Sequence, residues 1–278
     1  MYTFKVGDIV ARKSYGGDIP FVISSITQDE NGKPVYILKG LVYRIEADAR
    51  EDDLVRPNLK YVYMNMQRYM NEVTRYASTR LYPRGRYALA RPRYKPGKIL
   101  HIDSSSDFLE RCLRFYRDSG LKPVGELASE SRQPEIVRRL LEKHKPDILV
   151  VTGHDSIKKN SDKYNINSYS NSKYFVQSVR EARKYQMSYD KLCIFAGACQ
   201  SYYEAIMSAG ANFASSPGRI LINALDPAIV AEKIALTDSR MVVTPQEIAK
   251  ISISGSKGIG GINTKGQMIV EDGANKTV

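Results

Sequence analysis

From residue 97 onward, short apolar runs alternate with amphipathic segments, and this alternation restricts the chain to a small set of folds. Strand-like runs are KILHID (98–103), DILVVTG (147–153) and KLCIFAG (191–197), and RILINA (219–224) continues the series. Helix-like segments with a 3.6-residue period fill the intervals: 104–120, 133–145, 172–185, 200–210 and 226–237. Strands that alternate with helices form a parallel sheet with helices on both faces. The sequence therefore predicts an α/β domain over residues 97–278.

Residues 1–55 follow a different pattern. The strand-like runs DIVARK, PFVISSI, PVYILKG and VYRIEA are separated by turn signals, among them Gly16–Gly17 and Asn31–Gly32. We expect a small β-barrel of the SH3-like kind. Such a barrel does not by itself indicate its partner.

Residues 56–96 form a basic arm in which Arg and Lys alternate with tyrosines and Glu72 is the one acid. Pro and Gly in its second half predict a linker. The arm accounts for much of the net charge of +12. Basic residues interleaved with aromatics can bind nucleic acid. Because no nucleic-acid-binding motif accompanies the arm, we favour its lying on an acidic surface of this protein or another.

Composition excludes several classes of protein. The chain has 278 residues, 42% hydrophobic and 26% charged, as in ordinary globular proteins. No apolar stretch reaches the roughly 18 residues of a membrane span. The first residues lack the pattern of a signal peptide, which predicts a cytoplasmic protein. Three cysteines without a CxxC spacing predict neither disulfides nor a metal site, and we expect no cofactor.

Two rare residues follow two of the predicted strands. His154 comes directly after ILVVTG, and Cys199 comes after CIFAGA. Active sites of parallel sheets lie outside the carboxyl ends of the strands. An imidazole and a helix beginning at Gln200 would favour the Cys199 thiolate, and His154 could protonate a departing amine. The pattern predicts a Cys–His dyad, whereas Cys112 and Cys193 are expected in the core.

These residues resemble the caspase-like cysteine peptidases, the group of caspases, legumain, gingipain and clostripain. In that group an apolar strand leads to the catalytic His, and the next leads to an Ala-Cys pair, which Ala198–Cys199 matches. His154 is followed by Asp155, where the group usually has Gly. The resemblance implies a caspase-like sheet and an oxyanion hole made by backbone groups of Cys199, Asp155 and Gly153.

Over the whole chain, the sequence is similar to the YabG-type sporulation proteases of spore-forming bacteria. The segments that carry the similarity are FKVGDIVARKSYGGDIPF, the basic arm, PDILVVTGHD and CIFAGACQSYYEAI. The resemblance implies a cysteine endopeptidase of the mother cell that associates with the developing spore coat. It also implies that the substrates are spore-coat and coat-assembly proteins, cleaved after Arg.

A preference for Arg requires an acid in the pocket for the residue before the scissile bond (the S1 pocket). Asp103 is the candidate, with Asp155 and Asp226 as alternatives; Asp103 could equally cap the helix that follows it. An Arg-specific peptidase could also cleave itself, and Arg132 in ELASESRQPEI is a candidate site, as are arginines of the arm.

Two other functions remain open on the sequence alone. The chain could be a non-enzymatic protein that binds a polyanion, nucleic acid or a spore structure through the barrel and the arm. Alternatively, the same thiol could serve an acyl transferase or an esterase.

Overall fold

A mostly parallel six-stranded sheet forms the centre of the computed structural model, which describes residues 3–64, 67 and 93–271. The strand order is β13-β11-β10-β9-β7-β8. Only β13 runs antiparallel to its neighbour. The bounds are β7 (Ile99–Asp103), β8 (Val124–Leu127), β9 (Ile148–Val151), β10 (Cys193–Ala196), β11 (Phe213–Ser215) and β13 (Ile259–Gly261). The predicted mixed α/β architecture is confirmed.

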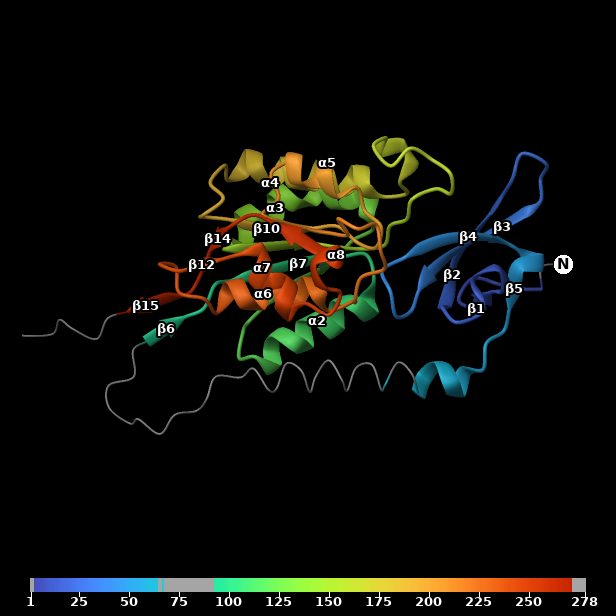
Figure 1. The fold of residues 1–278 in the computed structure, drawn as a ribbon, viewed down its shortest axis with the longest axis horizontal. Helices are drawn as coiled ribbons and strands as arrows, with labels where there is room; N and C mark the ends of the chain where they lie inside the picture. The colour runs from blue at the N-terminus through green and yellow to red at the C-terminus, as the bar shows by residue number, and fades with distance from the viewer. Residues whose placement is uncertain (1–2, 65–66, 68–92, 272–278) are drawn as a thin grey trace, which may run out of the picture.

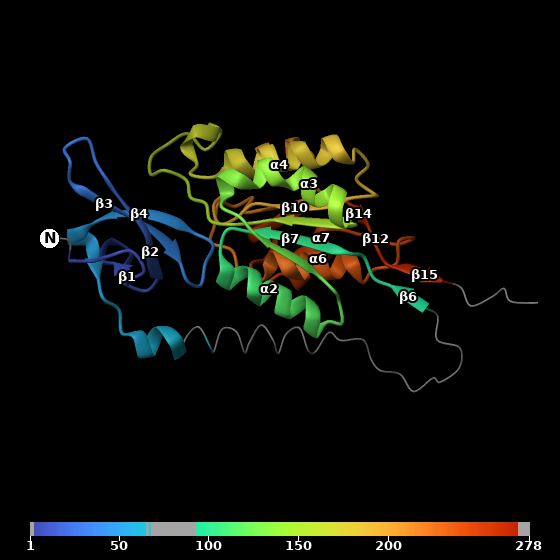
Figure 2. The same cartoon turned by 180° about the vertical axis from the view of Figure 1, so that it is seen from behind.

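Helices cover both faces of this sheet (Figure 1, Figure 2). One face carries α2 (Ser106–Asp118) and α6 (Asp226–Ala235); the other carries α3 (Gln133–His144), α4 (Ser172–Tyr185) and α5 (Tyr203–Ser208). Alternate side chains of each strand enter the two separate cores, as in β9, where Ile148 and Val150 enter one core and Leu149 and Val151 the other. A strand buried on both faces must be apolar throughout, which explains the continuous apolar runs.

A second, antiparallel sheet of five strands precedes the α/β region, in the order β4-β3-β2-β1-β5. Its strands are β1 (Ile9–Arg12), β2 (Pro20–Gln28), β3 (Pro34–Gly40), β4 (Glu46–Arg50) and β5 (Leu54–Val55). We call residues 3–55 the N-terminal module. Its apolar core is continuous with Cys199 and Ile222 of the α/β region. The module therefore lies against the carboxyl edge of the main sheet (Figure 1).

Smaller elements complete the described chain. A strand pair of β6 (Arg93–Lys95) and β15 (Ile269–Glu271) lies at the opposite end of the molecule from the module (Figure 1). The others are η1 (Lys13–Tyr15), η2 (Glu51–Asp53), η3 (Glu130–Arg132), η4 (Ile166–Ser168), β12 (Val242–Val243), β14 (Thr264–Lys265), α7 (Pro245–Ile251) and α8 (Gly255–Gly258). Residues 59–64 are helical, and most of the predicted basic arm lies outside the described residues. None of the described helices is both long and apolar enough to span a membrane.

Three predicted elements differ from the structure. RILINA (219–224) is not a strand, and Arg219 has a left-handed φ of 53°. The strand that lies next to β10 is instead β11. The helix expected from Gln200 begins only at Tyr203, because Gln200 is left-handed with φ 56°. In VYRIEA, the regular strand begins at Glu46, and the residues before it form a hairpin loop.

Candidate active site

The ends of β9 and β10 bring His154 and Cys199 to the same edge of the sheet. The two strands are parallel neighbours, with Val151 opposite Ala196. Each residue is the third after the end of its strand. Among the described residues, no hydrogen bond joins the Cys199 thiol to the His154 ring. The backbone N–H groups of Cys199 and of Asp155, the residue after His154, instead contact the same peptide segment, described below.

Cys199 is held by a tight turn. Gly197 has φ 112°, and a Cβ there would lie 3.2 Å from both Ile206 and Ser215, so the chain can leave the strand in this direction only with glycine. The Ala198 N–H donates to Ser201 Oγ at 2.9 Å and closes the turn. The helix begins at Tyr203, after this turn, and not directly after Cys199 as the sequence predicted.

The Cys199 thiol is fully buried in this arrangement. The Ile222 N–H donates to Sγ at 3.2 Å. Burial raises the pKa of Cys199 to about 12, because the thiolate loses its hydration. The thiol is therefore neutral in this buried position.

His154 is 2% exposed, and Glu130 holds it in place. The His154 N–H donates to Glu130 Oε1 at 2.8 Å, and the ring Nδ1 lies 3.8 Å from the same oxygen. Within the described chain, Nε2 of His154 is buried without a hydrogen-bond partner. Burial lowers the pKa of His154, against the opposing effect of Glu130, so the ring is neutral at pH 7.

Glu130 is a component of the site that the sequence did not indicate. Burial acts to raise its pKa, but the hydrogen bond with His154 and the charge of Lys39 outweigh burial and hold the pKa at about 2. Ser104 Oγ donates to its Oε1 at 2.5 Å. A permanently ionised carboxylate beside an imidazole stabilises the imidazolium and fixes the ring. No local pattern distinguishes Glu130 from other glutamates of the chain.

Asp103 lies at the end of β7 and binds Arg44 of the N-terminal module. The Arg44 Nη1 is 2.5 Å from Asp103 Oδ2, and both side chains are fully buried. Arg44 Nε and Nη2 also donate to the Ala224 carbonyl at 3.3 and 3.2 Å, and the guanidinium lies 4.7 Å from the centre of the Phe108 ring. Burial acts to raise the Asp103 pKa, but the Arg44 charge and the His101 hydrogen bond outweigh it and hold this pKa far below its usual value.

The helix after Asp103 is capped by Ser105 Oγ, which accepts from Phe108 N. Asp103 Oδ1 accepts from the Ser105 backbone N–H at 2.9 Å, and its other oxygen faces Arg44. Ser105, and not Asp103, is therefore the residue that caps this helix. Asp103 itself is buried against the Arg44 guanidinium, and its part in substrate specificity remains a prediction.

The carbonyl of Arg44 lies between the two strand ends. Its oxygen accepts from Cys199 N at 3.2 Å and from Asp155 N at 3.3 Å. These are two of the three backbone groups named from the sequence. The Arg44 backbone thus joins the loops that follow β9 and β10, while its side chain is buried against Asp103.

Asp155, Asp226 and Gly153 have other contacts. The Asp155 carboxylate accepts from Ser172 Oγ at 2.5 Å and Ser201 Oγ at 2.8 Å, and so joins the loops after β9 and β10. Burial raises the pKa of Asp155 to about 6. Asp226 accepts from backbone N–H groups, and neither carboxylate contacts Arg44. Gly153 gives Glu130 room, since a Cβ there would lie 2.6 Å from Oε1.

Arg132 is exposed, but its backbone is helical. It ends η3, and Gln133, the first residue of α3, is buried with hydrogen bonds to the Ala128 and Thr152 carbonyls. A peptidase binds an extended segment, so cleavage after Arg132 would require this region to unwind. Self-cleavage there remains a prediction.

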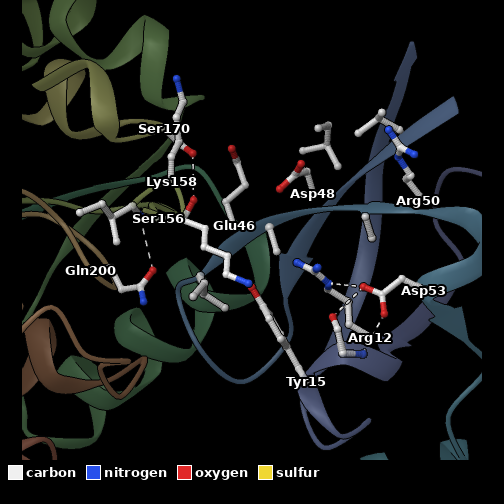
Figure 3. A pocket seen from close by; sticks show the side chains of 18 of the residues that line it. Arg12, Tyr15, Glu46, Asp48, Arg50, Asp53, Ser156, Lys158, Ser170 and Gln200 are labelled. Carbon is white, nitrogen blue, oxygen red and sulfur yellow. Dashed lines mark hydrogen bonds and ion pairs between the residues drawn. The ribbon is translucent and has the colours of Figure 1, made fainter. Parts of the chain in front are cut away.

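A cavity of about 1340 Å³ lies beside the candidate site, between β4 and the loop that follows Asp155 (Figure 3). Glu46, Asp48 and Arg50 line the module side, and Ser156, Lys158 and Gln200 face them from the α/β region. Cys199, His154 and Asp103 do not line it. These three residues and Arg44 are buried. Within residues 3–64, 67 and 93–271, no three His, Cys, Asp or Glu side chains gather to hold a metal ion.

The sequence did not indicate that Arg44 would be part of this site. The only signal was a charged residue inside an otherwise apolar run, GLVYRI. Such a residue in a strand ordinarily faces solvent. Its burial depends on a carboxylate 59 residues away.

Comparison with known proteins places the chain in a family. The profile described as YabG peptidase U57 matches residues 5–271. The sporulation-specific protease YabG of Bacillus subtilis (strain 168) is 38% identical over 281 residues, which cover 95% of this chain and 96% of that protein. A solved structure, the A domain of carboxylic acid reductase from Segniliparus rugosus with AMP and a co-purified carboxylic acid, matches with a TM-score of 0.32 and 12% identity. This match covers 83% of the present chain but only 28% of that one, and it indicates nothing about activity. From the family profile and the Bacillus relative together, the chain belongs to the YabG family of sporulation peptidases.

Proposed function

We propose that this peptidase is a cysteine endopeptidase that cleaves after arginine, with Cys199 as nucleophile and His154 as general acid and base. One observation carries the proposal: the Arg44 carbonyl oxygen accepts from the backbone N–H of Cys199 and of the residue after His154, while its guanidinium lies on Asp103. The same contacts are available to an arginine of another protein.

The chemistry follows from these positions. The neutral His154 takes the Cys199 proton, and Sγ attacks the carbonyl carbon, whose oxygen is stabilised by the two N–H groups. The C–N bond then breaks, and the amine leaves with the proton from His154. Water hydrolyses the remaining thioester and releases a C-terminal arginine. Glu130 acts as a positioning residue that stabilises the protonated ring.

Specificity for arginine rests on the buried carboxylate. Asp103 is fully buried and held by Thr152 Oγ1 at 2.8 Å as well as by Arg44. A buried carboxylate left without a cation is strongly unfavourable. The pocket therefore selects arginine over neutral side chains, and the Phe108 face suits a planar guanidinium.

We further propose a caspase-like relationship and substrates among spore-coat and coat-assembly proteins of the mother cell. The parallel sheet with Cys and His at adjacent strand ends supports the first. Membership of a family of sporulation peptidases supports the second. The SH3-like character of the module remains a prediction.

The test is hydrolysis of a fluorogenic peptidyl-arginine amide, assayed in an Arg44→Ala background so that the pocket is open. Cys199→Ala and His154→Ala should each lower kcat/KM by about a thousandfold or more. Cys193→Ala removes another buried thiol, in β10, and is the matched control that should retain activity. Equal rates in the Cys199 and Cys193 variants would refute the proposal.

A further inference from the structure

The Arg44 segment, residues 43–46, occupies the candidate site although it belongs to the N-terminal module. It forms the end of the hairpin between β3 and β4. The Gly40 N–H donates to the Ile45 carbonyl at 2.9 Å and closes the loop. A Cβ at Gly40 would lie 2.4 Å from the Tyr43 carbonyl oxygen, so this turn requires glycine. The module thus holds the segment in one position.

The Arg44 segment pairs with the α/β region on both sides of Arg44. Tyr43 forms an antiparallel bridge with Asn223, and Ile45 forms a parallel bridge with Asp155. The Glu46 N–H donates to the Asp155 carbonyl at 3.1 Å. An extended chain that adds main-chain bonds on both sides of a cleft is bound in the way that peptidases bind substrates.

The same segment closes the site to other peptides. Arg44, Asp103 and Cys199 all have 0% exposure. An arginine from another chain can reach Asp103 only after Arg44 has left. In addition, the tether gives the Arg44 segment a far higher effective concentration than a dissolved protein substrate has.

We propose that the Arg44–Ile45 peptide bond is a self-processing site of this peptidase and that the Arg44 segment blocks the cleft until that bond is cut. The proposal rests on the proposed cysteine-peptidase function. Cys199 Sγ bonds to the Arg44 carbonyl carbon, the Arg44–Ile45 C–N bond breaks, and the Ile45 nitrogen takes the thiol proton through His154. Water then hydrolyses the thioester, which leaves a carboxylate on Arg44 and a free amine on Ile45.

The two fragments remain associated after the cut. β3 pairs with β4 from Val35–Arg50 to Lys39–Glu46, and these strands lie on opposite sides of the bond. Detection therefore requires denaturing conditions. The bond is also better placed than Arg132–Gln133, because the Arg44 segment is already extended across Cys199 and Asp155 whereas Arg132 is helical.

The experiment compares full-length chains by intact mass under denaturing conditions. The wild type should yield one fragment that ends at Arg44 and one that begins at Ile45, while Cys199→Ala stays intact. Arg44→Ala should not be cut at this position and should hydrolyse a peptidyl-arginine amide at least tenfold faster at the start than freshly purified wild type. Arg50→Ala, an exposed arginine of the adjacent strand, is the control and should behave as wild type.

Ile45→Pro provides a second variant that keeps Arg44 and its pairing with Asp103. It should stay uncut and remain slow on the peptide, with an unchanged circular dichroism spectrum. If Arg44→Ala hydrolyses the peptide but wild type is cut only at other arginines, the self-processing site is refuted and the proposed function stands. If no variant hydrolyses the peptide and no chain is cut, both are refuted.

Discussion

At the scale of single residues, the site is defined by opposite pKa shifts of buried groups. Burial makes the Cys199 thiol a weak acid and the His154 ring a weak base, while Glu130 remains ionised. Transfer of the thiol proton from Cys199 to His154 is therefore unfavourable while both side chains are buried. If the Arg44 segment leaves after cleavage, as we propose, water reaches the thiol and much of this penalty is removed.

Glu130→Gln should lower kcat/KM at pH 7 by about tenfold and shift the acidic limb of the pH profile to lower pH. The carboxylate favours protonated His154, so its loss lowers the histidine pKa further and makes the neutral ring a poorer base for the Cys199 proton. Rates in the Arg44→Ala background across pH 4–9 test this. Glu142→Gln, an exposed glutamate of α3, should leave the profile unchanged, and an unshifted limb in Glu130→Gln would exclude the positioning role.

At the scale of elements, the turn between β10 and α5 determines where the thiol lies. Positive φ values at Gly197 and Gln200 redirect the chain twice within four residues. The run GACQS contains Gly197, which indicates a turn. Gln200 was instead assigned to the helix, because a helical pattern follows it. The loops after β9 and β10 are then joined through Asp155 and Ser201.

Gly197→Ala should destabilise the protein by about 1–3 kcal/mol and lower activity more than stability alone explains. Its φ of 112° is unfavourable for alanine, and the added Cβ meets Ile206 and Ser215 at 3.2 Å, which moves Cys199. Urea unfolding and the peptide assay measure the two effects. Gly120→Ala has a positive φ of 78° but open space, so it isolates the backbone strain; equal losses in both variants would argue against the packing effect.

At the scale of the whole molecule, the buried Arg44–Asp103 pair joins the N-terminal module to the α/β region. The shared apolar core around Cys199 and Ile222 supports the same contact. Breaking a buried pair is costly, since the remaining charge has no partner. The module and the site are therefore coupled in stability.

Asp103→Asn should lower the free energy of unfolding by about 3–5 kcal/mol, because it leaves the Arg44 guanidinium buried without its carboxylate. Thermal and urea unfolding of the Cys199→Ala chain, which lacks the proposed nucleophile, measure this loss. Asp190→Asn removes an exposed pair with Lys265 and should change stability by less than about 1 kcal/mol. Similar losses in the two variants would mean that the buried pair does not join the module to the α/β region.

By itself, the sequence determined the parallel sheet, the helices on its two faces and the placing of His154 and Cys199 at its carboxyl edge. It could do so because strand and helix periods are local, and adjacent parallel strands end at one edge. It misassigned RILINA as a strand, since an apolar run without periodicity fits a buried loop equally well. Only the tertiary structure decided that Arg44 is buried against Asp103 and that Glu130 holds His154. These contacts join residues 59 and 24 positions apart, and they arise from the docking of one surface on another, which no local pattern encodes.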